Sequence, residues 1–153
     1  TVGRRGTIFT SSDGTTWTKR SSNIQGNLYG VTYGNGLFVT VGRRGTIFTS
    51  SDGTTWTQRT SGTSKILLTG VTYGNGLFVT VGWKGTILTS PDGTTWTKRS
   101  SGISDRLMGV TYGNGLFVTV GWEGTILTSS DGISWTSRTS GTSNRLYGVT
   151  YSE

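Results

Sequence analysis

Apolar and polar residues along this chain repeat with a period of about 40 residues. Residues 30–42 read Gly-Val-Thr-Tyr-Gly-Asn-Gly-Leu-Phe-Val-Thr-Val-Gly, and the same sequence returns at 70–82 and at 109–121. A fourth copy is split between residues 148–151 and residues 1–3. Two apolar runs on either side of Gly-Asn-Gly predict a β-hairpin, because Asn and Gly tolerate the positive φ angles of a tight turn. The chain therefore begins and ends within copies of one hairpin.

Each repeat holds four strand-like segments, which we number from the first strand to the fourth strand. In the repeat that contains residues 30–42, the strands are 28–33, 37–42, 45–50 and 54–59. Between them lie the first turn (Gly34-Asn35-Gly36), the second turn (Arg43-Arg44) and the third turn (Asp52-Gly53), and a connecting loop follows at 60–64. Such short connections predict an antiparallel meander. The second strand is apolar at successive positions, which is typical of a sheet covered on both faces.

Four-stranded units of about 40 residues are typical of β-propeller blades. We therefore predict an all-β fold, a β-propeller of four-stranded antiparallel blades with four repeats per chain. Residues 146–151 supply the first strand of a blade whose remaining strands lie in residues 1–20, so the N- and C-termini share the closing blade. The repeats form a single propeller domain or a half-propeller over residues 1–153, at approximately 28–66, 67–105, 106–144, and 145–153 together with 1–27.

The third turns share a motif that reads TSSDGTTW at 10–17 and 49–56, TSPDGTTW at 89–96 and TSSDGISW at 128–135. It resembles the Asp-box of bacterial-neuraminidase-repeat β-propellers, S-x-D-x-G-x-T-W, with one residue fewer between Asp and Gly. The G-T-I-x-T-S and G-V-T-Y-G-N-G patterns around it are also similar to the photosystem II assembly-factor type of propeller. The resemblance implies a structural turn in which the carboxylate accepts backbone N–H groups and the Trp packs between blades. It assigns these roles to Asp13, Asp52, Asp92 and Asp131, and to Trp17, Trp56, Trp96 and Trp135.

The composition supports many short strands and tight turns. The 153 residues include 26 Gly, 1 Pro, no Ala, no Cys and no His, which disfavours helices and excludes disulfides and thiol chemistry. No apolar run reaches membrane-spanning length and no signal-peptide pattern is present, so we expect a soluble chain without a membrane partner and leave its compartment open. Residues 1–22 and 40–61 differ at only two positions. The array has therefore been either amplified recently or engineered.

Positive charge is expected on one face of the fold. The chain has 14 Lys and Arg against 7 Asp and Glu. In a meander, the second turns and the connecting loops share one face, and the first and third turns share the other. The fourth strands end in basic residues near the former face, where only Asp105 and Glu123 oppose them. Candidate ligand-binding residues are those of the second turns, namely Arg4, Arg5, Arg43, Arg44, Trp83, Lys84, Trp122 and Glu123.

Three functions fit this face. The first, which we favour, is a non-catalytic structural scaffold with no assigned ligand, in which the second turns and loops vary freely and their charges are solvated. The second is a lectin-like module for acidic or other glycans, with Arg as a bidentate donor to anions and Trp stacking on sugar rings. The third, less favoured because no recognised module is present, is nonspecific nucleic-acid binding.

Catalysis, cofactors and bound metals are not expected. The chain lacks His and Cys, and it offers no differentiated pair of carboxylates of the kind that sialidases use. The four third-turn Asp residues lie one repeat apart and offer one carboxylate each, which suits metal binding poorly.

The number of blades is left open between a four-bladed monomer and an eight-bladed homodimer. We favour the homodimer, because near-identical repeats can exchange neighbours between chains at little cost.

Overall fold

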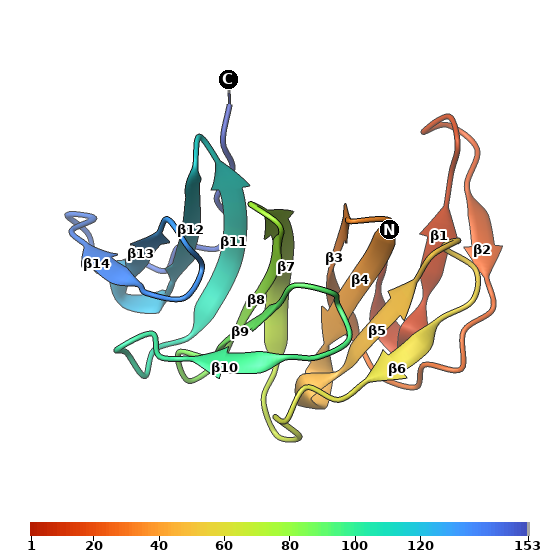
Figure 1. Cartoon of the computed structure of the whole chain (residues 1–153), viewed down its shortest axis with the longest axis horizontal. Coiled ribbons are helices and arrows are strands. Elements are labelled where there is room, and N and C mark those ends of the chain that lie inside the picture. Colours follow the sequence, from red (N-terminus) through yellow and green to blue (C-terminus); the bar gives the residue numbers. More distant parts are fainter. Residues whose placement is uncertain (153) are drawn as a thin grey trace.

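The computed structural model describes residues 1–152, and it is built from β-strands joined by tight turns (Figure 1). The strands are β1 (Ile8–Thr10), β2 (Thr18–Arg20), β3 (Leu28–Gly34), β4 (Leu37–Gly42), β5 (Ile47–Ser50), β6 (Thr57–Arg59), β7 (Leu68–Gly74), β8 (Leu77–Gly82), β9 (Ile87–Ser90), β10 (Thr97–Arg99), β11 (Leu107–Gly113), β12 (Leu116–Gly121), β13 (Ile126–Ser129) and β14 (Thr136–Arg138). No helix in the described part of the chain is long and apolar enough to cross a membrane.

The strands form three complete blades, each a four-stranded antiparallel sheet in chain order. These are β3–β6, β7–β10 and β11–β14. Strands β1 and β2 form a smaller sheet, to which Val2 adds through a bridge with Ile8. The predicted all-β propeller with four-stranded antiparallel blades is confirmed.

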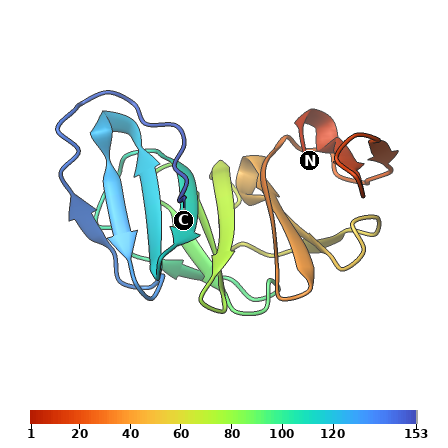
Figure 2. The ribbon, with the colours of Figure 1, turned by 90° about the horizontal axis from the view of Figure 1, so that it is seen from above.

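The blades are arranged in an arc (Figure 2). The first strands β3, β7 and β11 lie side by side on its inner side, and the fourth strands β6, β10 and β14 lie on its outer side. This order follows from the meander, because each sheet is traversed from the inner strand to the outer one. The first strands therefore line the inner side of the arc.

Each blade buries one apolar face against the next blade. Val39 and Val41 of β4 and Ile47 of β5 form one cluster with Leu68 and Phe78 of the following blade, and all five side chains are fully buried. A corresponding cluster joins β7–β10 to β11–β14. The second strands lie at the middle of these sandwiches, which explains why they are apolar at successive positions.

The inner strands approach so closely that glycine is required where each first strand ends. A Cβ at Gly34 would overlap the ring of Tyr73, and the same holds for Gly74 with Tyr112. The first turn has two residues at its tip, Asn35 and Gly36, with φ of 47° and 75°. Such positive φ angles explain the Asn-Gly sequence of this turn.

The fourth strands are shorter than predicted. We expected residues 54–59, but β6 begins at Thr57, because Thr54 and Thr55 donate their backbone N–H groups to Asp52 in the third turn. The third strand likewise begins at Ile47 rather than Gly45, because residues 43–45 form a single 3-10 turn.

The divided blade does not close within one chain. Residues 146–151 lie beside β11, with Tyr151 against Gly113, and the Leu146 N–H donates to the carbonyl oxygen of Gly121 at the end of β12. Strands β1 and β2 lie at the other end of the arc beside β3–β6 (Figures 1 and 2). We predicted a strand at 146–151, and this prediction is wrong for the single chain. The physical reason is that residues 1–3, which would supply the second strand of this blade, lie at the far end of the arc.

Replacing Phe78 tests the packing between blades. Phe78→Ala should lower the free energy of unfolding by about 3–5 kcal/mol, because a fully buried aromatic side chain leaves a cavity between two rigid sheets. Chemical denaturation followed by Trp fluorescence measures this. The control is Ile133→Ala, at a position that is 45% exposed, and an equal loss in both variants would contradict the inter-blade core.

Candidate ligand-binding face

The second turns of the four repeats share one strained backbone geometry. Arg5, Arg44, Lys84 and Glu123 have φ of 54°, 61°, 57° and 54°, in the left-handed region that favours glycine. The glycine that follows each of them is fixed by the connecting loop; for example, the Gly45 N–H donates to the carbonyl oxygen of Ile66 at 2.6 Å. Charged side chains therefore stand at four equivalent positions where glycine would be less strained.

Polar hollows lie beside three of these turns. Each is lined by the strained residue, by the end of the fourth strand and by the connecting loop. In the three hollows the lining includes Arg5, Lys19 and Arg20; Arg44, Gln58 and Arg59; and Lys84, Lys98, Arg99 and Asp105. The fourth strand ends consistently here because its last Arg donates from Nε to a Thr of the third strand, as Arg59 does to Thr49 at 2.9 Å.

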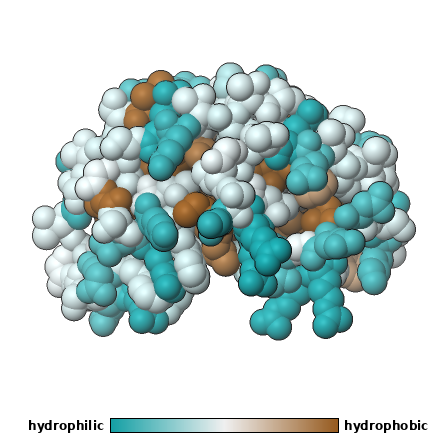
Figure 3. Space-filling model, turned by 90° about the horizontal axis from the view of Figure 1, so that it is seen from below, coloured by the Kyte–Doolittle hydropathy of each residue, from teal (hydrophilic) through white to brown (hydrophobic). Residues whose placement is uncertain are grey.

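These turns, hollows and loops make up what we call the basic face. Figure 3 views the molecule from this side and shows hydrophilic side chains spread across it. The predicted grouping of second turns and connecting loops is found, since hydrogen bonds join them in every repeat. Lys and Arg side chains line the hollows beside three of the four second turns on this face.

Four side chains of the basic face form a continuous stack, which we call the Arg–Trp stack. The guanidinium carbon of Arg106 lies 3.6 Å from the ring centroid of Trp83 and 4.1 Å from that of Trp122. The guanidinium of Arg145 lies 3.7 Å from the Trp122 centroid. Two guanidinium groups this close to one ring cannot share a face, so Arg106 and Arg145 cover opposite faces of Trp122.

The stack changes what the two tryptophans can bind. Both were candidates for stacking on a sugar ring, but guanidinium groups already cover the two faces of Trp122. Its Nε1 is buried and has no hydrogen-bond partner among residues 1–152. Trp83 has Arg106 over one face, and it also lines a cavity of about 410 Å³ with Arg43, Arg44, Lys65 and Leu67. Trp83 therefore remains the candidate for stacking, and Trp122 does not.

The roles of Arg106 and Arg145 in the stack were missed from the sequence, although a signal was present. The residue that starts each second turn varies together with the residue just before the next first strand. Where the second turn starts with Trp, the later residue is Arg. Where the second turn starts with Arg, the later residue is Asn or Leu. The pairs are Arg4–Asn27, Arg43–Leu67, Trp83–Arg106 and Trp122–Arg145. Comparing the repeats in this way predicts the contact.

The third turns are closed by their own aspartates, away from the basic face. Asp52 accepts the N–H groups of Thr54 and Thr55, each at 2.8 Å, and the Ser50 hydroxyl at 2.9 Å. The Trp56 indole donates to Gly53 at 3.2 Å. The same bonds recur around Asp13, Asp92 and Asp131, as the Asp-box resemblance implies.

Hydrogen bonds to the carboxylates lower their pKa values. Backbone N–H groups of Ile133 and Ser134 lower the pKa of Asp131 to about 2. Backbone and side-chain donors in the turn hold the pKa of Asp13, Asp52 and Asp92 well below its usual range. Among residues 1–152 no group of three or more acidic residues is placed to hold a metal ion.

The third-turn tryptophans pack between blades in three of four cases. Trp56, Trp96 and Trp135 each contact a core cluster shared with the preceding blade. Trp17 is 49% exposed, because the preceding blade is absent at this end of the arc.

Comparison with known proteins supports the fold. No protein-family model matches the sequence, and no curated protein matches it. The solved structure of YCF48 bound to D1 peptide superimposes with a TM-score of 0.72 and 21% identity, covering 97% of this chain and 52% of that one. The structure of YCF48 from Cyanidioschyzon merolae superimposes with a TM-score of 0.63 and 22% sequence identity, covering 75% of this chain and 40% of that one. The chain resembles the Asp-box β-propellers. It spans about half the length of the first YCF48 structure.

The Asp-boxes should make stability fall in acid. Because the folded-state pKa values lie below the ordinary value of 3.8, the ionised carboxylates stabilise the fold above that pH, and this contribution is lost as pH falls toward the folded values. Denaturant unfolding measured from about pH 5 to about pH 2 should therefore show decreasing stability. In a variant with all four Asp replaced by Asn, stability at neutral pH should be lower and should change less with pH. An unchanged pH dependence in that variant would contradict the assignment.

The Arg–Trp stack should contribute measurably to stability. Arg106→Ala should lower the free energy of unfolding by about 1–2 kcal/mol, because two cation–π contacts are lost. Arg106→Lys keeps the charge but not the planar group, so it separates stacking from charge. If Arg106→Lys retained the full stability, stacking would not be the source of the effect.

Proposed function

We propose that this chain is a non-catalytic β-propeller scaffold whose basic face binds an acidic glycan. One observation carries the proposal: charged side chains occupy the strained left-handed position of all four second turns, and three of the four are cations. Backbone strain of this kind persists where the side chain has a use. We also infer that the repeats were amplified recently or engineered, because residues 1–22 and 40–61 differ at only two positions.

The hydrogen bonds and the positions of the acidic residues support a non-catalytic role. The four third-turn aspartates accept hydrogen bonds that keep them ionised, which makes them poor proton donors. Asp105 shares its hollow with Lys84, Lys98 and Arg99 rather than with a second carboxylate. Glu123 stands on a second turn of a different blade. No two of these acids share one environment in the way that glycoside hydrolysis requires.

The cavity beside Trp83 supports a glycan as the ligand. Its lining includes the cations Arg43, Arg44 and Lys65, and Leu67 and Trp83 supply apolar surface. Arginine can bind sulfate or carboxylate groups with two parallel hydrogen bonds, and an indole face suits the apolar face of a sugar ring. Because polar hollows lined by Lys or Arg also lie beside three of the second turns, a chain of acidic sugars could occupy several sites at once and gain affinity through multivalency.

Nucleic acid is the competing anionic ligand, and salt dependence distinguishes the two. Binding to a phosphate backbone releases counterions and weakens steeply with salt regardless of sequence. Binding that uses Trp83 should weaken less with salt and should depend on the identity of the sugar. A scaffold without a ligand would bind neither a glycan array nor single-stranded DNA.

Replacing the strained cations by glycine separates binding from folding. The variant Arg5→Gly, Arg44→Gly and Lys84→Gly should keep its stability to within about 1 kcal/mol, because relief of strain offsets the greater chain entropy of glycine. Its affinity for a sulfated glycan should fall at least about tenfold, which corresponds to about 1.4 kcal/mol. Titration calorimetry and denaturation measure the two quantities.

A matched control is Glu123→Gly, which relieves the same strain without removing a cation. Glycan affinity in this control should stay the same or rise. Trp83→Ala should also weaken glycan binding, whereas weakening of DNA binding alone in the triple variant would favour the nucleic-acid alternative. Unchanged affinity for both ligands would overturn the proposal.

A further inference from the structure

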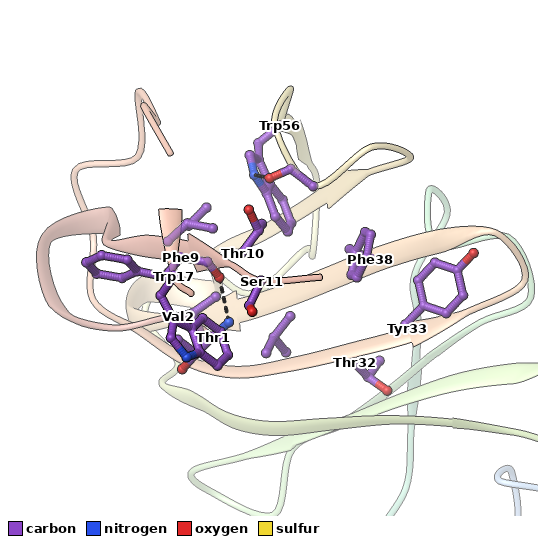
Figure 4. A pocket seen from close by; sticks show the side chains of 13 residues that line it. Thr1, Val2, Phe9, Thr10, Ser11, Trp17, Thr32, Tyr33, Phe38 and Trp56 are labelled. Carbon is purple, nitrogen blue, oxygen red and sulfur yellow. Dashed lines mark hydrogen bonds between the residues drawn. The ribbon is translucent and has the colours of Figure 1, made fainter. Parts of the chain in front are cut away.

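The N-terminal end of the arc has a groove where an inner strand is missing. Residues 1–20 supply only part of a blade, and a cavity of about 310 Å³ lies between them and β3. Figure 4 shows Val2, Trp17, Tyr33 and Phe38 around it. The exposed fraction is 49% for Trp17 and 59% for Tyr33. The equivalent tryptophans Trp96 and Trp135 and the equivalent tyrosines Tyr73 and Tyr112 pack against core clusters.

The C-terminal end of the arc has the opposite deficiency. Residues 146–151 lie beside β11 in the place of an inner strand, but no second strand pairs with them among residues 1–152. Tyr147 and Tyr151 are 63% and 47% exposed. On β12, Leu116 is 42% exposed, although the equivalent Leu37 and Leu77 are partly buried. One end therefore lacks an inner strand, and the other end carries an inner strand without the rest of its blade.

Contacts between the complete blades show how these two ends would fit together. A Cβ built at Gly93 in a third turn would lie 3.4 Å from Leu37 of the preceding blade, and one built at Gly132 would lie 2.7 Å from Leu77. The equivalent Gly14 has no atom of residues 1–152 within 4 Å. By the same correspondence, the partner of Gly14 is Leu116, the exposed leucine at the other end of the arc.

We propose that a second copy of this chain closes the arc, with residues 146–151 of each copy filling the N-terminal groove of the other. Trp17 and Gly14 of one copy then cover Leu116 of the second copy, and the two arcs form a ring of eight blades. The occupant is specified by the sequence, because residues 148–151 repeat the Gly-Val-Thr-Tyr of the inner strands that fill this place in the complete blades. This inference does not depend on glycan binding.

The proposal also specifies contacts at the junction. In the complete blades, the first N–H of a second turn donates to the residue just before the inner strand, as Arg43 does to Asn27 at 2.9 Å. Across the junction the corresponding bond runs from the Arg4 N–H to the Arg145 carbonyl oxygen of the second copy. The inner strands of the complete blades end in Gly against a Tyr ring, but residue 152 is Ser. Its Cβ would crowd Tyr33 of the second copy, so the junction is weaker than an internal contact.

Mass measurement on the chain and its variants tests the proposal. Light scattering at micromolar concentration should give about 33 kDa, which is twice the 16.3 kDa of one chain. Leu116→Lys should shift the mass to that of one chain without unfolding it, because this residue is exposed in the single arc. Ile133→Lys is the matched control, since it is 45% exposed on a third turn and lies outside the junction, and it should remain dimeric.

A variant that should strengthen the dimer shows whether loss of the dimer in Leu116→Lys reflects the interface or misfolding. Ser152→Gly removes the crowding Cβ and should tighten the dimer several-fold, measured by dilution. A mass of 16 kDa for both the unmodified chain and Ser152→Gly would overturn the proposal. So would a dimer that persists in Leu116→Lys, because another interface would then hold it, or a larger closed assembly with a different number of copies. Glycan binding by an unmodified chain that stays at the mass of one chain would leave the proposed function intact while overturning this inference.

Discussion

The requirement that every blade cover the apolar face of the blade before it governs this molecule. Val39, Val41 and Ile47 are fully buried only because Leu68 and Phe78 come from the next repeat. A single repeat would expose half of its core, so the repeats are stable as an array and not one by one. The same requirement explains the ends of the arc, where Trp17 and Leu116 are exposed although their equivalents are covered.

The two faces of the array serve different purposes for a physical reason. On the face with the third turns, Asp side chains accept the backbone N–H groups and close the turn, so their charge is used within the turn. On the basic face, the second turns are fixed by backbone bonds to the connecting loops. The side chains there are consequently free to differ, and Arg, Lys, Trp and Glu occupy equivalent positions. Variation is concentrated where no side chain is needed to close the turn.

Much of the fold could be predicted from the sequence because its signals are local. Asn35-Gly36 requires positive φ angles, and the strand 37–42 was predicted at its observed bounds. The start of the fourth strand could not be predicted by counting alternation, because hydrogen bonds to Asp52 hold residues 54–55 in the turn. The Arg–Trp stack joins residues of different repeats, so it was accessible only by comparing how positions vary together. The exposure of Trp17 depends on which blade lies next to it, and no local pattern reports this.

The proposed junction between two copies has an apolar part and a basic part. Apolar side chains dominate the groove and the exposed part of β12, which favours association through burial. On the basic face, however, a closed junction would bring Arg145 of one copy close to Arg4 and Arg5 of the other. Like charges oppose contact there, and an anion bound between them would relieve the repulsion. Closure and anion binding would therefore favour each other, because a ligand that binds the closed form more tightly also stabilises it. The Arg–Trp stack ends at this same place, where Arg145 covers Trp122.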